Sequence, residues 1–166
     1  MNKTEIKNEI NELKKRIAEL ETRLEEKKVK KGKIWKPEES EEYYYLNGCG
    51  YTRDIYTESE IDLIEVANGN CYSTKEKAEF EANREKYTRL FRQYVEQHSE
   101  PLDWKDDEQE KYSVYYNYSI KKLEFGYYYS YRDVSTIFAS SIEVLKEAID
   151  YVGEDNIKKY ILEIKE

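Results

Sequence analysis

The sequence predicts an α+β protein in which an N-terminal α-helical coiled coil precedes a domain of antiparallel β-hairpins, or a meander, with two to three packed helices. Three patterns support this prediction. Apolar residues recur every three or four positions near the N-terminus, which is helical spacing. Apolar and polar residues alternate in two tyrosine-rich stretches, as in half-buried strands. Hydroxyl residues with a glutamate three positions later precede two apolar runs, as at helix N-termini.

Residues 1–31 are expected to form a coiled-coil oligomerisation helix. Alternating intervals of four and three separate its apolar residues, which are Ile6, Ile10, Leu13, Ile17, Leu20 and Leu24. β-branched residues at the first heptad position, with mostly Leu at the fourth, favour a parallel dimer. In that register Glu9 faces Lys14 of the second helix, and Arg16 faces Glu21. These opposite-sign pairs favour self-association over the alternative, in which the helix folds back onto its own chain.

Residues 32–41 are expected to be a linker, and residues 42–166 a tyrosine-rich α+β domain. The heptad pattern stops at Lys27, a charged residue at an apolar heptad position, and Gly32 then marks a break. The boundary is therefore placed after residue 31.

A first hairpin is predicted with strands at 42–46 and 51–56. Asn47-Gly48 between them supplies the positive φ angles that a tight turn requires. The segment 61–66 is compatible either with a strand or with one helical turn. Asn68-Gly69-Asn70 predicts a further turn before a short extended segment.

A long helix is expected to follow Ser73, whose hydroxyl would accept from the amide of Glu76 in a capping box, and to end before Pro101. Its apolar stripe comprises Phe80, Tyr87, Leu90, Phe91 and Tyr94. Three arginines fall off that stripe, namely Arg84, Arg89 and Arg92.

A second hairpin is predicted from the alternation at 112–120 and 123–131, and residues 132–138 could add a third strand. Ser140 and Glu143 repeat the hydroxyl-to-glutamate spacing, so another helix is expected there. Gly153 suits the end of that helix. Asp155 could then cap a short last helix.

The charge distribution disfavours direct nucleic-acid binding. Residues 1–36 contain 12 Lys and Arg against 7 Asp and Glu, whereas the remainder of the chain contains 16 against 29. An acidic body repels phosphates at long range. The sequence has no long apolar stretch for a membrane, and its two cysteines are too few for a disulfide framework, so we expect a cytoplasmic protein.

No cofactor, metal or enzymatic activity is expected. The only histidine, His98, falls near a predicted helix end, and the cysteines Cys49 and Cys71 are far apart in the sequence, so a zinc site is disfavoured. All six glycines are isolated or in turns, which excludes a phosphate-binding loop. The sequence therefore favours a binding protein.

Tyrosine is the remaining candidate for recognition, with 18 copies concentrated on the predicted strands. Most of these rings are expected to form the core. Tyr115 and Tyr128 fall on the opposite parity from the apolar positions, and tyrosine gives a large, rigid contact area. The candidate recognition surface comprises one of Tyr43 or Tyr44, together with Arg53, Tyr115, Tyr128 and Arg132. The alternative for the arginines is pairing with local carboxylates.

Three segments resemble a pattern found in small accessory proteins of phages and prophages of low-GC Gram-positive bacteria. They are Trp35-Lys36-Pro37-Glu38, the aromatic strand Glu42–Leu46, and Gly69–Glu79 with its Gly-Asn turn and capped helix. The closing segment Phe138–Glu154 is similar to the same pattern. The resemblance implies a protein that acts inside a host bacterial cell, in many cases against host defence. It implies no catalytic residues.

The leading hypothesis is therefore a non-enzymatic counter-defence inhibitor that binds a host protein through an acidic, tyrosine-rich surface. One alternative is a homo-oligomeric sponge that sequesters a nucleotide signal in aromatic pockets, with arginines meeting the phosphates. A second alternative is a virion or morphogenesis component that uses the coiled coil for assembly.

Overall fold

The computed structural model describes residues 9, 10, 12–14, 16, 17, 34–133 and 135–164. The chain divides into two compact units, Met1–Lys36 and Pro37–Glu166.

The described residues between 9 and 17 in the first unit are helical. Ile10, Leu13 and Ile17 expose 46%, 59% and 54% of their surface. The other three positions of the predicted stripe, Ile6, Leu20 and Leu24, lie outside the described residues. The pairing of two helices in a coiled coil stays a prediction.

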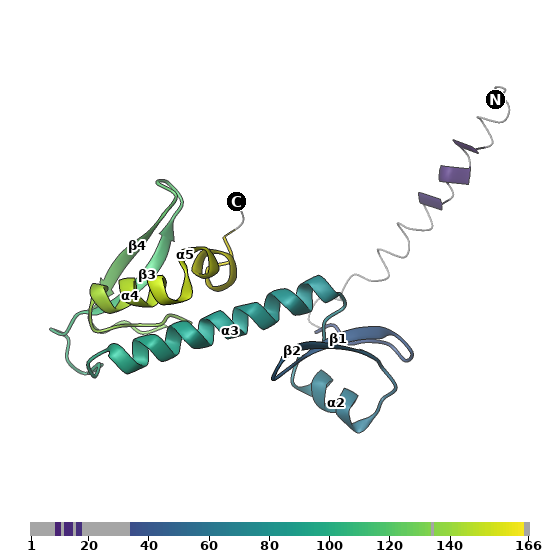
Figure 1. The fold of residues 1–166 in the computed structure, drawn as a ribbon, viewed down its shortest axis with the longest axis horizontal. Coiled ribbons are helices and arrows are strands. Elements are labelled where there is room, and N and C mark those ends of the chain that lie inside the picture. Colours follow the sequence, from purple (N-terminus) through teal and green to yellow (C-terminus); the bar gives the residue numbers. More distant parts are fainter. Residues whose placement is uncertain (1–8, 11, 15, 18–33, 134, 165–166) are drawn as a thin grey trace. The chain divides into compact units, whose positions relative to one another are not determined.

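The second unit is α+β, as predicted, with two antiparallel hairpins, one long helix and shorter helices (Figure 1). Its elements in chain order are β1 (Glu42–Asn47), β2 (Gly50–Ile55), α2 (Glu60–Ala67), α3 (Lys75–His98), β3 (Lys111–Asn117), β4 (Lys122–Tyr128), α4 (Ile142–Val152), α5 (Glu154–Asn156) and the π-helical turn η1 (Ile157–Ile161). None of the described helices combines the length and the apolar character needed to cross a bilayer.

The first hairpin turns one residue later than predicted. Asn47 pairs with Gly50 as the last residue of β1, so the turn is Gly48-Cys49. The side chain of Asn47 accepts a hydrogen bond of 2.9 Å from the Cys49 amide, and the positive φ falls on Gly50, at 134°. Residues 37–41, expected in the linker, are joined to this unit, since the Ser40 amide donates to the Tyr56 carbonyl at 2.8 Å.

Residues 61–66, which were compatible either with a strand or with one helical turn, belong to the helix α2. Ser59 caps its N-terminus in a capping box with Asp62, and each side chain accepts from the backbone amide of the other. Because this box satisfies two amides that have no partner inside the helix, a helix of only 8 residues is stable here.

Helix α3 begins one residue later than the capping box predicted. Thr74, rather than Ser73, accepts from the Lys77 amide at 3.2 Å. Phe91 and Val95 are buried, and the predicted stripe residues Tyr87, Leu90 and Tyr94 pack partly buried around them. The three arginines expected off the stripe are exposed.

The strands of the second hairpin are shorter than the alternation predicted. Asn117 pairs with Lys122, so residues 118–121 form the turn, in which Lys121 has a φ of 55°. The segment after β4 is not a third strand in its described residues. Only Ala139 makes an isolated bridge, with Tyr112 of β3.

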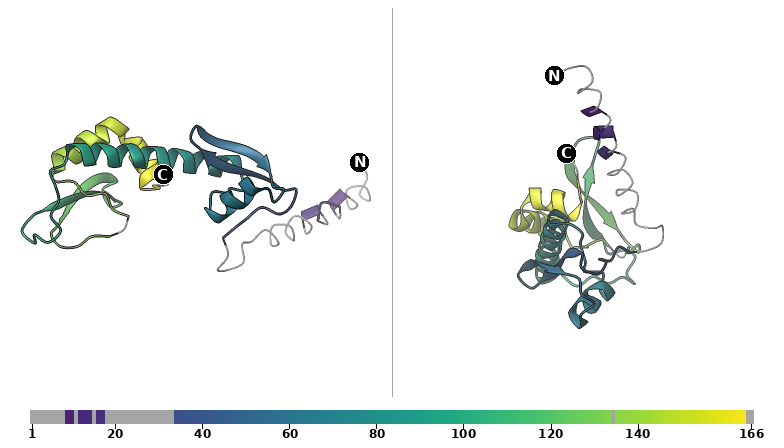
Figure 2. Two further views of the ribbon diagram at one scale, coloured as in Figure 1. Left: turned by 90° about the horizontal axis from the view of Figure 1, so that it is seen from below. Right: turned by 90° about the vertical axis from the view of Figure 1, so that its right-hand side faces the viewer.

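The core of this part lies between α3, α4 and one face of the second hairpin. α4 supplies four buried residues, and Val114 of β3 and Phe125 of β4 pack against them. These buried α4 residues are Leu145, Ala148, Ile149 and Val152. The views in Figure 2 agree that α4 lies along α3. Ser141 caps α4, one residue after the expected Ser140, and Gly153 ends it with a φ of 92°.

Candidate functional site

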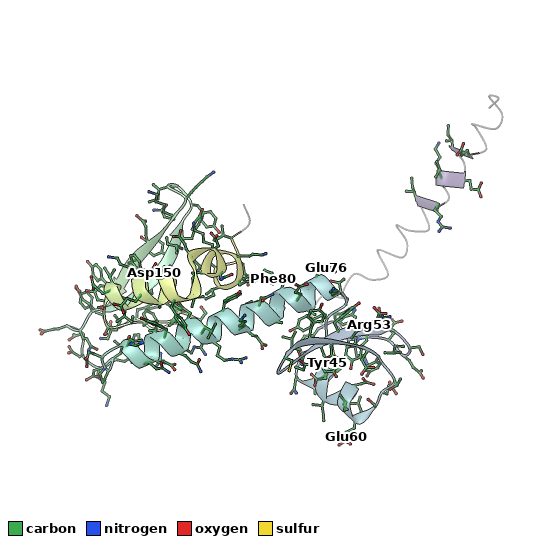
Figure 3. The ribbon with its side chains drawn as sticks, in the orientation of Figure 1. Tyr45, Arg53, Glu60, Glu76, Phe80 and Asp150 are labelled. Atoms are coloured by element: carbon green, nitrogen blue, oxygen red, sulfur yellow. The ribbon has the colours of Figure 1, made fainter. Side chains whose placement is uncertain are left out.

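The predicted recognition residues lie at two separate places. Tyr43, Tyr44 and Arg53 belong to the first hairpin, which contacts the start of α3. The second hairpin lies beside α4, where Asp150 is labelled in Figure 3. The structure therefore does not gather the six residues into one surface.

Tyr43 belongs to the core, so the prediction that it could form part of the recognition surface is wrong. Its ring is 0% exposed, and its hydroxyl donates a hydrogen bond of 2.7 Å to Asp62 of α2. Burial and this bond to a carboxylate raise the pKa of Tyr43 far above its usual value of 10.0. No partner protein could touch the ring without opening the hairpin.

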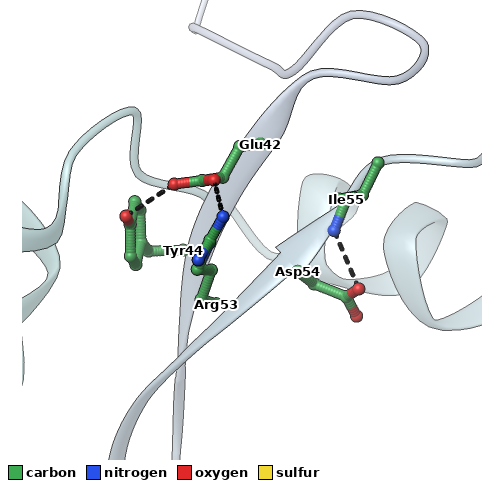
Figure 4. A network of polar contacts seen from close by, with 5 residues as sticks. All are labelled: Glu42, Tyr44, Arg53, Asp54 and Ile55. Carbon is green, nitrogen blue, oxygen red and sulfur yellow. Dashed lines mark hydrogen bonds and ion pairs between the residues drawn. The ribbon is translucent and has the colours of Figure 1, made fainter.

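Tyr44 and Arg53 meet on the same carboxylate, that of Glu42 (Figure 4). The Tyr44 hydroxyl donates to Glu42 at 2.7 Å, and the Arg53 guanidinium pairs with the same group. These two donors lower the pKa of Glu42. Arg53 is thus engaged by a local carboxylate, which was the alternative to a ligand anion.

Tyr115 and Tyr128 lie on one face of the second hairpin and remain exposed, at 43% and 37%. They flank Gly126. A Cβ atom at Gly126 would lie 3.5 Å from the Tyr115 ring and 3.6 Å from the Tyr128 ring, so the two rings close over the glycine. The Tyr115 hydroxyl donates to Glu124 at 3.2 Å.

Two residues absent from the candidate surface support this face. Phe138 makes an edge contact with Tyr128, with ring centroids 5.7 Å apart, and another with Trp104 at 5.1 Å. The guanidinium of Arg132 lies 5.1 Å from the centre of the Trp104 ring, and Tyr131 lies beside Tyr128 at 6.2 Å. We call this set the aromatic face; it comprises Trp104, Tyr115, Tyr128, Tyr131, Arg132 and Phe138.

A buried lysine joins the aromatic face to residues 103–110, the acidic segment that precedes β3. Lys111 is 0% exposed, and its ammonium donates to the backbone carbonyl of Asp106 at 2.5 Å while lying 5.7 Å from the centre of the Trp104 ring. Within the acidic segment, the backbone amide of Asp103 donates a hydrogen bond of 2.7 Å to the side-chain oxygen of Gln109. Lys111 therefore connects this segment with Trp104 of the aromatic face.

Glu110, at the end of this segment, accepts from two tyrosine hydroxyls. Tyr112 donates to one of its oxygens, and Tyr129 donates to the other at 3.2 Å. The hydrogen bonds to Glu110 raise the pKa of both hydroxyls above the usual 10.0. One carboxylate therefore fixes the positions of two phenol rings.

The described residues contain no group of three or more His, Cys, Asp or Glu side chains that could hold a metal ion. Comparisons with models of protein families, with curated proteins and with solved structures found no match.

Proposed function

We propose that this protein is a non-enzymatic binding protein that recognises another protein through the aromatic face of its second hairpin. The observation that supports this most directly is the exposure of Tyr115, Tyr128 and Tyr131, at 43%, 37% and 63%. Phe138 contacts the Tyr128 ring, and Trp104 in turn contacts Phe138. Rings held in place by such contacts lose little side-chain entropy when a partner covers them.

The charge of the body favours a basic partner surface. Excluding residues 1–36, the chain has 16 Lys and Arg against 29 Asp and Glu, and part of this excess lies in the acidic segment anchored by Lys111. Complementary charge speeds encounter and rejects wrong partners. A basic groove that normally holds nucleic acid is a surface of this kind, so we propose inhibition of a host defence protein by occupation of such a groove.

Self-association is the second part of the proposal. Ile10, Leu13 and Ile17 expose about half of their surface in the single chain, and heptad spacing places them on one helix face. A parallel dimer would cover them and would present two aromatic faces. Two linked faces bind a dimeric or repetitive target more tightly than one, because the second contact forms at a high effective concentration.

The proposal is tested by affinity measurement on the full chain. A partner is recovered from the bacterial host with tagged wild type, purified, and titrated with the double variant Tyr115→Ser/Tyr128→Ser. Tyr151→Ser on α4, where the residue is 63% exposed, is the matched control. We expect the double variant to weaken binding at least tenfold, which is about 1.4 kcal/mol, with the control unchanged. Equal affinities for all three proteins would contradict it.

A further inference from the structure

A groove that borders the aromatic face lies between α3 and the segment that follows β4. Its volume is about 580 Å³, and its wall includes Arg92 and Val95 of α3 together with Arg132, Ile137 and Phe138. Small-molecule sites have volumes of roughly 300–1,000 Å³. The groove is therefore large enough for a mononucleotide.

Two guanidinium groups in the groove have no carboxylate partner among the residues that the structure describes. Within the described residues, no ion pair involves Arg92 or Arg132. The neighbouring arginines of α3 differ, since Arg84 pairs with Glu163 at 3.1 Å and Arg89 with Glu85 at 3.8 Å. The donors of Arg92 and Arg132 are thus available to an anion that enters the groove.

The groove is held in position before any ligand arrives. The Arg132 guanidinium lies over the Trp104 ring at 5.1 Å, which restrains its stem. The following Asp133 accepts from the amides of Ser135 and Thr136 at 2.8 Å and 2.7 Å, and hydrogen bonds from Thr136 and Ser135 lower the pKa of Asp133 to about 2. Asp133 is therefore occupied by its own turn and competes little for the arginines.

We propose that this groove binds a nucleoside phosphate. Arg92 and Arg132 would hold the phosphate oxygens, because guanidinium groups match phosphate in both charge and geometry. Ile137 and Phe138 would provide the apolar wall for a base. Glu96, whose carboxylate makes no hydrogen bond or ion pair to any described residue, would accept from a ribose hydroxyl or an exocyclic amine.

The three chemistries together distinguish a nucleotide from simpler anions. Inorganic phosphate would use the arginines alone, and a nucleoside would use only the wall and Glu96. A ligand with a charged end, hydroxyl groups and a planar ring uses all of them. The groove shares Arg132 and Phe138 with the aromatic face, whereas Arg92, Glu96 and Ile137 belong to the groove alone.

The test is titration of the full-length, isotope-labelled protein by nuclear magnetic resonance and calorimetry. The probes are ADP, GDP, CDP and UDP, with inorganic pyrophosphate and adenosine as partial ligands. We expect at least one nucleotide to bind, to shift the amide signals of Ile137 and Phe138, and to bind at least tenfold more tightly than pyrophosphate or adenosine. Arg92→Gln and Arg132→Gln should each weaken that binding about tenfold or more.

Arg53→Gln is the matched control, since Arg53 is an exposed arginine on the first hairpin. It should leave nucleotide binding unchanged, and thermal melting checks that the groove variants fold as wild type does. The proposal is overturned if no nucleotide binds at millimolar concentration, if pyrophosphate binds as tightly as every nucleotide, or if Arg53→Gln weakens binding as much as the groove variants do. Arg92 is not part of the aromatic face, so Arg92→Gln should weaken nucleotide binding and leave the tyrosine-dependent protein contact unchanged, and the two proposals fail separately.

Discussion

The hydroxyl of Tyr43 in β1 donates a hydrogen bond of 2.7 Å to the carboxylate of Asp62 in α2, and the two residues are only 0% and 2% exposed. The same carboxylate accepts from the amides of Thr57 and Ser59 at 2.9 Å and 3.0 Å. Asp62 therefore joins a strand, the connecting segment and a helix N-terminus. It holds α2 against the first hairpin.

Removal of this carboxylate should destabilise the protein. Asp62→Ala leaves the Tyr43 hydroxyl and two amides without their acceptor, and we expect a loss of about 3 kcal/mol in the free energy of unfolding. Tyr43→Phe removes one donor only and should cost ~1–2 kcal/mol. Urea unfolding measures both. Asp54→Ala, at an exposed aspartate on β2, is the control and should change stability little; a control loss as large as that of Asp62→Ala would refute the assignment.

Stability should fall in acid because of Asp62 and Asp133. Burial opposes ionisation of Asp62, but hydrogen bonds from Tyr43, Thr57 and Ser59 outweigh it and lower its pKa below the usual 3.8. A carboxyl with a lowered folded pKa stabilises the fold above its unfolded pKa, and that contribution is lost as the pH falls through the folded value. We expect the loss to begin near the unfolded value of about pH 4 and to continue as the pH falls, with the Asp62 contribution lost at a lower pH than that of Asp133. Asp62→Asn should flatten the decline; an unchanged pH profile would be inconsistent with this role.

Thr74 and Ser73 should respond differently to substitution. Thr74→Ala removes the oxygen that accepts from the Lys77 amide, so it should destabilise the protein by about 1 kcal/mol. Ser73→Ala is the matched control and should cost well under half as much. Thermal unfolding of the two variants compares them. A larger effect of Ser73→Ala would place the start of α3 one residue earlier than the structure does.

The proposed dimer should depend on the exposed heptad residues. Ile10→Asp/Ile17→Asp places carboxylates on the apolar stripe, where an interface would have to bury them without partners. Light scattering with size-exclusion chromatography should give twice the chain mass for wild type and the mass of one chain for the variant. A wild-type protein that runs as a monomer at micromolar concentration would exclude the coiled coil.

Local patterns predicted much of the second hairpin. Period-two alternation is a property of the strand itself, so it assigned Tyr115 and Tyr128 to the face opposite Val114 and Phe125, as observed. The predicted strand extended beyond the end of β3 because the alternation continues into the turn, where Tyr118 lies. Alternation records side-chain type, and it contains no signal for where the backbone hydrogen bonds stop.

The other differences between the sequence prediction and the structure have two causes. In some places two adjacent residues could serve as the same helix cap, and in others the contact joins residues that are far apart in the sequence. Ser73-Thr74 and Ser140-Ser141 each offer two adjacent hydroxyls, and the sequence does not decide which becomes the cap. Tyr43 is buried because Asp62 lies 19 residues further on, in a helix that sequence patterns left open. Trp104 and Phe138 meet only through the folded course of the chain, so no spacing rule could have paired them.

The central claim is that the aromatic face contacts another protein, and site-specific photo-crosslinking tests it most directly. A photoreactive phenylalanine analogue replaces Tyr115, Tyr128 or, as the control, Tyr151, one at a time, in the full chain inside the bacterial host. We predict that positions 115 and 128 form an adduct with one and the same protein, identified by mass spectrometry, and that position 151 does not. The absence of adducts at both hairpin positions, or an equal yield of that adduct at position 151, would contradict the account.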